Sequence, residues 1–280
     1  MAARAMVVGG TSGIGYAIAC RIAAESASST VIISGRKKPK TTIPHANIKF
    51  QPLDASSLSS IKQYTDVYKT AHKQSLDLLV LTQGIMTTAG RTETPEGIDY
   101  KMALHYYGRQ LLIRELLPAL TDTAKVLIVL DGLRGSPTKL NWKDLDLKTH
   151  FSLGSAADHC ISMNDAMVQV HASQKGTKRH FVHAHPGRVK TDLWSTLPWY
   201  LRALMEPLSH VLCVSPESCA GNLLKGTSEC SAMAEKEGKF WSCIDGKGRL
   251  VPNKPSWSGE ELRWVADRTW KLIDDTLNTA

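Results

Sequence analysis

Apolar runs and amphipathic stretches alternate along most of the chain. Short runs rich in Val, Ile and Leu occur without polar alternation, as in "AMVVGG", "TVIISG", "LDLLVLTQG" and "KVLIVLDG". Longer stretches with helical spacing separate them, as in "GIGYAIACRIAAES" and "SLSSIKQYTDVYKTAH". Continuous apolar runs are typical of parallel strands buried on both faces, and helices are the usual crossovers between such strands. The pattern predicts an α/β fold with a doubly wound, mostly parallel sheet.

We expect a single domain over 1–280. The length suits one large core, and no linker, internal repeat or low-complexity segment divides the chain. The least regular segment is 192–235, where Pro198, Pro207 and Pro216 interrupt apolar stretches rich in Trp, Leu and Met. We interpret this segment as a small helical lid over a substrate. The alternative is a satellite helical pair packed on the core.

Composition narrows the class of protein. Apolar residues make up 42% of the chain and charged residues 21%, and no window approaches the roughly eighteen apolar residues of a membrane span. The N-terminal "MAARAMVVGG" runs into a strand and a glycine turn, which leaves no room for a secretory signal. We therefore expect a cytoplasmic protein without a membrane span.

Charge and cysteine usage exclude two further classes. The net charge is +8, but the basic residues are spread along the chain and no aromatic residues interleave with them, so we expect solvated faces and no nucleic-acid partner. The six cysteines show neither CxxC spacing nor a companion histidine run. We expect neither a disulfide framework nor a metal site.

A glycine-rich turn joins the first predicted strand to the first predicted helix. The segment is "VVGGTSGIGYAIA" (7–19). Glycines permit a tight turn and a close backbone approach to a pyrophosphate, whose charge then lies at the helix N-terminus. The expected cofactor-binding residues of this turn are Gly9, Thr11, Ser12, Gly13, Ile14 and Gly15.

A basic side chain follows the second predicted strand. "SGRKK" (34–38) places Arg36 where an Asp would bind the ribose hydroxyls of NAD. A guanidinium instead offers a planar cation to a 2′-phosphate. The sequence therefore favours NADP(H) over NAD as the cofactor.

These motifs resemble the short-chain dehydrogenase/reductase family, and the resemblance covers nearly the whole chain. G-x-x-x-G-I-G opening a helix is similar to the family fingerprint, "HAHPGRVKTDL" (183–193) resembles its Pro-Gly turn and following Thr, and 94–120 resembles the long central helix of the retinol-dehydrogenase-like branch. The composite looks like fungal members associated with secondary metabolism. The resemblance implies a Rossmann fold and further cofactor contacts at Asp54, Gly84, Pro186, Gly187, Val189 and Thr191.

The resemblance fails at the active site. The family uses an Asn, a Ser, a Tyr and a Lys, and these positions fall here on His105, Asp131, Cys160 and Asn164. No Tyr occurs between Tyr107 and Tyr200, so a shifted alignment restores nothing. A positioned general acid and an oxyanion donor together supply roughly 5–9 kcal/mol of barrier reduction. Ordinary ketone reduction by the family mechanism is therefore not expected.

Three functions stay open. An atypical NADP(H)-dependent oxidoreductase could deliver hydride to a cationic acceptor such as an iminium, stabilised by Asp131. A non-redox isomerase, cyclase or dehydratase could use Asp131, His105 and Cys160 as acid/base groups, with Asn164 also in the site and the nucleotide vestigial. A catalytically silent nucleotide-binding scaffold is the third. For His183 and His185, which flank a predicted strand, we expect a structural role.

The segment 192–235 and the family resemblance suggest which partners the protein binds. Trp194, Trp199 and Leu201 could line an apolar pocket, which predicts a hydrophobic small-molecule substrate. Relatives in the family often pair through the central and active-site helices, so the resemblance implies a homodimer or homotetramer.

Overall fold

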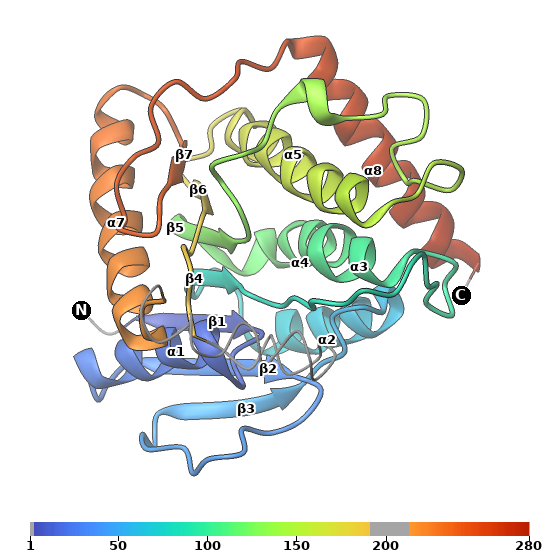
Figure 1. Cartoon of the computed structure of the whole chain (residues 1–280). Helices are drawn as coiled ribbons and strands as arrows, with labels where there is room; N and C mark the ends of the chain where they lie inside the picture. Colours follow the sequence, from blue (N-terminus) through green and yellow to red (C-terminus); the bar gives the residue numbers. More distant parts are fainter. Residues whose placement is uncertain (1–2, 191–212, 280) are drawn as a thin grey trace.

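A seven-stranded parallel sheet forms the centre of the protein. The computed structural model describes residues 3–190 and 213–279 (Figure 1). The strand order is β3-β2-β1-β4-β5-β6-β7, and every neighbouring pair is parallel. The strands are β1 (Arg4–Val8), β2 (Thr30–Gly35), β3 (Ile48–Pro52), β4 (Leu76–Leu81), β5 (Leu120–Val129), β6 (His180–Ala184) and β7 (Trp241–Ile244). The predicted doubly wound Rossmann-like fold is confirmed.

Helices cover both faces of the sheet. One face packs against α1 (Gly13–Glu25) and α7 (Pro216–Lys236), and the other against α2 (Leu58–Ala71), α4 (Gly108–Leu116), α5 (Leu153–Ala172) and α8 (Gly259–Thr279). The short α3 (Tyr100–Met102) and a π-helical turn (η1, Ala103–Tyr107) lead into α4. The 3₁₀ turns η2 (Leu117–Ala119) and η3 (Pro137–Lys139) complete the described helices.

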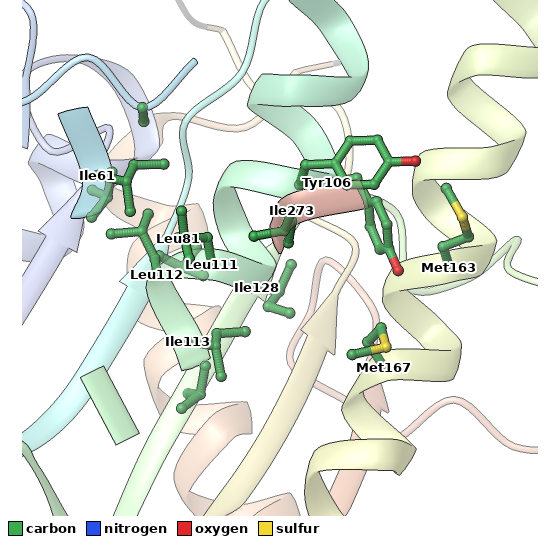
Figure 2. Packing of buried hydrophobic residues seen from close by; sticks show 14 of the residues in the cluster. Ile61, Leu81, Tyr106, Leu111, Leu112, Ile113, Ile128, Met163, Met167 and Ile273 are labelled. Carbon is green, nitrogen blue, oxygen red and sulfur yellow. The ribbon is translucent and has the colours of Figure 1, made fainter. Parts of the chain in front are cut away.

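The strands contain continuous apolar runs because helices cover both faces of the sheet. Successive strand residues point to opposite faces. Met6 and Val8 therefore join the core beneath α2, α4, α5 and α8, while Ala5 and Val7 join the core beneath α1 and α7. Figure 2 shows the first core where side chains of the central helix meet Met163 and Met167 of α5.

The C-terminal helix α8 lies against the central and active-site helices (Figure 1). The Tyr106 and Thr269 hydroxyls are 2.6 Å apart, and Arg114 donates to Asp274 at 2.8 Å. Ile273 is fully buried in the shared core. The helices through which pairing was expected therefore already have an intramolecular partner.

The predicted lid lies partly outside the described residues. Residues 192–212, including Trp194, Trp199 and Leu201, are not described, and the lid stays a prediction there. Pro216 stands at the first turn of α7, where proline is tolerated because its missing N–H has no helical partner. The part of 192–235 from Pro216 onward thus belongs to a long helix packed against α1. No helix in the described ranges is long and apolar enough to cross a membrane.

Candidate nucleotide and active site

The glycine turn between β1 and α1 is closed by backbone contacts. Gly9 and Gly13 have φ of +82° and +54°, in the left-handed region that favours glycine. A Cβ on Gly15 would lie 2.4 Å from both the Gly9 carbonyl oxygen and Thr82 Oγ1. Ser12, the N-cap residue of α1, makes no side-chain capping hydrogen bond. The first N–H groups of α1 therefore remain available to an anion, and the turn fits a pyrophosphate.

The two other predicted residues of the turn pack beside it. Thr11 lies against Gly35 at the end of β2, where a Cβ on Gly35 would come within 2.9 Å of Thr11 Oγ1. Ile14 is half-buried against the core beneath α1 and α7. Their contacts hold the turn against the sheet.

The residues predicted to bind the adenosine half of the cofactor lie just after β2 and β3. Arg36 is exposed and donates from Nη1 to the Tyr100 hydroxyl at 2.9 Å. A guanidinium has five N–H donors, so this contact leaves donors for a phosphate. Asp54 Oδ1 accepts from the Ser56 N–H at 3.0 Å and from the Ser56 hydroxyl at 2.6 Å, which fixes the carboxylate after β3.

An unexpected amide lies after β4. Gln83 is only 6% exposed, and neither its Nε2 nor its Oε1 has a hydrogen-bond partner among the described residues. The backbone carbonyl oxygen of Gln83 accepts a hydrogen bond from the buried Arg109 side chain at 2.6 Å. Buried amides normally have partners, so this side chain fits a bound ligand or water. Sequence reasoning did not select Gln83 because its burial depends on the packing of the central helix.

His105 supports the loop that follows β4. The Ile85 N–H donates to His105 Nε2 at 2.9 Å, and a Cβ on Gly84 would lie 3.1 Å from that nitrogen. Burial lowers the pKa of His105 to about 3, with Arg109 and Lys101 adding to the effect. The imidazole is therefore neutral at neutral pH and accepts at Nε2. A larger residue at position 84 would therefore have to displace the imidazole by a few tenths of an ångström.

The positions of the family Tyr and Lys lie inside the protein. Cys160 is 1% exposed, and burial raises the pKa of its thiol to about 12. Asn164 Nδ2 donates to the carbonyls of His105 (3.0 Å) and Cys160 (2.7 Å), while its Oδ1 accepts from Gln110 at 2.9 Å. The Asn164 amide therefore ties α5 to the π-helical turn. These contacts support a structural role for both residues.

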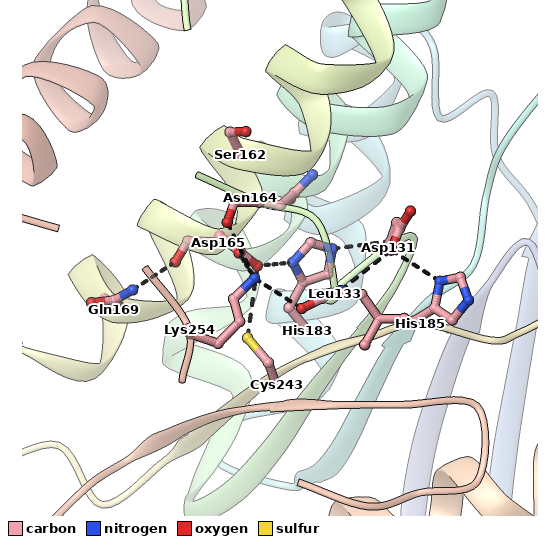
Figure 3. Close-up of polar contacts among 12 residues, drawn as sticks. Asp131, Leu133, Ser162, Asn164, Asp165, Gln169, His183, His185, Cys243 and Lys254 are labelled. Atoms are coloured by element: carbon pink, nitrogen blue, oxygen red, sulfur yellow. Dashed lines mark hydrogen bonds and ion pairs between the residues drawn. The ribbon is translucent and has the colours of Figure 1, made fainter. Parts of the chain in front are cut away.

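Asp131 stands at the carboxyl end of β5, where ligands bind in open α/β sheets. Its Oδ1 lies 2.9 Å from His185 Nδ1, and its Oδ2 accepts from Arg134 Nε at 2.5 Å (Figure 3). Burial raises the pKa of Asp131, but the neighbouring His185 ring and the hydrogen bond from Arg134 outweigh it and hold the pKa well below its usual range. The side chain is a carboxylate at neutral pH.

A second, buried cluster lies behind Asp131. Asp165 of α5 contacts His183 Nδ1 and Lys254 Nζ, and the Cys243 Sγ is 3.7 Å from its Oδ1 (Figure 3). Lys254 also donates to the carbonyls of Gly132 (2.9 Å) and Gly135 (3.3 Å). The cluster fixes the chain that follows Asp131. Sequence analysis missed it, because its residues are far apart along the chain and match no motif.

The Pro-Gly turn after β6 follows the same edge. Gly187 has φ of +76°, and the Pro186 carbonyl accepts from Cys219 Sγ at 3.4 Å. Val189 is 7% exposed and forms a parallel bridge with Val214. Thr191 lies outside the described residues. The structure thus brings Gly187 to the sheet edge that carries Asp131.

The glycine turn on the first strand of a doubly wound parallel sheet defines the class of Rossmann-like proteins. Within that class, residues 3–130 match the family model for short chain dehydrogenase. The chain belongs to the short-chain dehydrogenase/reductase family. It is 34% identical over 202 residues to an oxidoreductase of Emericella nidulans, covering 68% of this chain and 60% of that protein.

Two further relatives are similar to this chain in sequence, and two solved structures are similar to it in fold. An oxidoreductase of Emericella variicolor is 30% identical (68% of this chain, 58% of the relative), and a short-chain dehydrogenase/reductase of Stachybotrys chartarum is 26% identical (77% and 69%). The chain spans about 60% of the length of the Emericella nidulans relative. An NADPH-bound carbonyl reductase from chicken fatty liver has TM-score 0.61 at 18% identity (89% and 98% covered). A family protein from Francisella tularensis has TM-score 0.61 at 19% identity (88% and 98%).

Proposed function

We propose that this protein is an NADP(H)-dependent oxidoreductase with a non-standard active site, acting on a hydrophobic small molecule. The glycine turn carries the proposal, because the 2.4 Å separation between a Cβ on Gly15 and the Gly9 carbonyl oxygen leaves room there for glycine alone. A turn closed this tightly presents backbone N–H groups to a pyrophosphate. The NADPH bound by the chicken carbonyl reductase of similar fold supports the choice of cofactor.

Different residues of this chain would bind different parts of the cofactor. The turn at Gly9–Gly15 would hold the pyrophosphate, Arg36 the 2′-phosphate and Asp54 the adenine. Gln83 and the Pro186–Gly187 turn would lie toward the nicotinamide ribose and ring. The bound nicotinamide supplies or accepts a hydride. The sheet edge at Asp131 then provides the surroundings of the substrate.

The substrate class rests on weaker support. The fungal oxidoreductases among the relatives are consistent with a fungal metabolite, and we propose a hydrophobic secondary metabolite. The apolar side chains expected to line its pocket belong to 192–212.

Calorimetric titration with NADPH, NADP and NADH tests the proposal. We expect preference for the phosphorylated nucleotides, and we expect Arg36→Leu to weaken NADPH binding by about 10–100-fold, the value of a charge-assisted phosphate contact of roughly 1.5–3 kcal/mol. NADH binding should not change. The matched control is Arg263→Leu, which removes an exposed arginine on α8. Absence of NADPH binding by the wild-type protein would contradict the proposal.

A non-redox reaction on the same fold is the second candidate. The observation in its favour is that Asp131 Oδ1 and His185 Nδ1 lie 2.9 Å apart, because a carboxylate and an imidazole side by side are acid/base groups that need no hydride donor. Turnover of a metabolite without a change in NADPH absorbance would favour this candidate. A protein that binds NADPH and turns over nothing would be the catalytically silent scaffold.

A further inference from the structure

The family tyrosine has no replacement at its own position. Cys160 is buried and holds its proton tightly, and Asn164 has no proton to give. His105 uses Nε2 to accept from the Ile85 N–H and is neutral at neutral pH. Of the four replaced positions, only Asp131 lies in the segment that leaves the carboxyl end of a strand, two residues after β5. The source of a proton must therefore be sought among the neighbours of Asp131.

The neighbour that qualifies is His185. Parallel pairing continues past β5 and β6, because the Leu130 N–H donates to the Ala184 carbonyl at 3.0 Å, and this contact brings residues 131 and 185 together. His185 Nδ1 lies 2.9 Å from Asp131 Oδ1 (Figure 3). The His185 side chain is 30% exposed, against 12% for Asp131. The imidazole is thus the outer member of the pair.

We propose that His185 transfers the proton to or from the substrate oxygen in place of the missing tyrosine, and that Asp131 positions its ring. The inference rests on the proposed function and specifies its substrate class. A carboxylate beside Nδ1 favours the tautomer with the proton on Nδ1. Nε2 then faces away from Asp131 and has no hydrogen-bond partner among the described residues.

The position suits a proton donor beside a nicotinamide. His185 directly precedes the Pro186–Gly187 turn, which the proposed function places toward the nicotinamide. Asp131 lies two residues after β5, at the same edge of the sheet. Both groups therefore lie at the edge where the reacting atoms are expected, whereas Cys160 lies in the core.

The proton balance identifies a carbonyl compound, or the corresponding alcohol, as substrate. In reduction, the carbonyl carbon gains the hydride and its oxygen gains the Nε2 proton of the His185 imidazolium. The electron pair of that N–H bond stays on Nε2, leaving a neutral imidazole, and Asp131 remains a carboxylate. In alcohol oxidation, neutral His185 takes the hydroxyl proton. A cationic acceptor such as an iminium needs no proton when it gains the hydride, so it would leave this proton transfer without a role.

Chemical footprinting tests the inference without requiring turnover. Diethyl pyrocarbonate modifies accessible neutral imidazoles, and mass spectrometry identifies each modified histidine. We expect modification of His185 but not of His183, whose side chain is 0% exposed. A hundredfold excess of NADPH over its Kd should slow modification of His185 at least tenfold. His150, with a side chain 72% exposed, serves as the internal control and should react equally with and without NADPH.

Two further measurements test the roles of the pair. Nitrogen-15 NMR of the wild-type protein should find that the neutral form of His185 carries its proton on Nδ1, and Asp131→Asn should shift that proton toward Nε2. With 9,10-phenanthrenequinone as the carbonyl probe and NADPH as reductant, His185→Gln should lose about 10²–10⁴-fold in kcat. Its Kd for NADPH should be unchanged. His150→Gln is the matched control and should keep wild-type values.

The outcomes separate the inference from the proposed function. Absence of NADPH binding overturns the proposed function. NADPH binding without protection of His185 overturns the inference alone, and so does a His185→Gln variant that turns over the quinone at the wild-type rate. A wild-type tautomer with its proton on Nε2 removes the positioning role of Asp131, and this result does not depend on the folding of any variant.

Discussion

Lys254→Met tests the buried cluster behind the site. The Lys254 side chain is 7% exposed and that of Asp165 is 1% exposed, so both charges are shielded from water. Methionine preserves most of the side-chain volume and removes the ammonium group. The substitution leaves Asp165 in contact with the His183 ring and the Cys243 thiol, and it removes the donor to the Gly132 and Gly135 carbonyls.

The expected destabilisation is large. Breaking a buried ion pair by removing one partner costs about 3–5 kcal/mol, because an uncompensated charge remains in the interior. At about 2 °C per kcal/mol for a domain of this size, the melting temperature should fall by roughly 6–10 °C. Differential scanning fluorimetry and urea unfolding at neutral pH measure the change.

Two variants complete the design. Lys271→Met removes an ammonium from a pair with Asp275 whose side chains are 65% and 64% exposed, and it should cost less than about 1 kcal/mol. Asp165→Asn combined with Lys254→Met removes both buried charges and should recover about 1–3 kcal/mol relative to the sum of the single variants. The reasoning is refuted when Lys254→Met melts within error of Lys271→Met, or when the double variant shows no coupling.

Three further predictions concern acid stability, the glycine turn and assembly. Burial depresses the pKa of His105 to about 3 and the pKa of both His171 and His180 to about 4. Below about pH 6.5 the unfolded chain therefore binds protons that the folded protein does not bind, and stability should fall by roughly 3 kcal/mol per pH unit from pH 6 to 5. Urea unfolding measures this slope, and His171→Gln should reduce it by about a third. Gly15→Ala should abolish NADPH binding in calorimetry because its Cβ would meet the Gly9 carbonyl oxygen at 2.4 Å, whereas Gly154→Ala, with a nearest atom at 3.9 Å, should bind normally. Light scattering should give a mass near 30.7 kDa, because α8 covers the helices through which pairing was expected; a dimer would mean that another face is used.

The parts of the site that could be predicted from sequence depend on neighbours along the chain. The glycines at 9, 13 and 15 are constrained by one turn, and the position of Asp131 follows from the end of one apolar strand. Arg36 was assigned in the same way from the end of the second strand. Residues close in sequence keep nearly the same local geometry in any fold with this order of elements, so a local pattern suffices to locate them.

The roles of the residues at the Tyr and Lys positions could not be judged in this way. Cys160 and Asn164 follow the family alignment, but the sequence does not reveal that Asn164 bonds to the His105 carbonyl, 59 residues earlier in the chain. The same holds for His185, for which a structural role was expected. Its contact with Asp131 arises because β5 and β6 are neighbours in the sheet.

The sequence by itself therefore determined the doubly wound sheet and the glycine turn, and it predicts the loss of the family tetrad. These features follow from apolar periodicity, glycine conformation and residue identity, which are local properties. Tertiary structure alone decided which polar groups are buried, which remain at the sheet edge and which meet across it. Burial and the contacts of Asp131 with His185 and of Asp165 with Lys254 set the charge and proton state of the site, and both depend on segments that only the packed sheet and helices bring together.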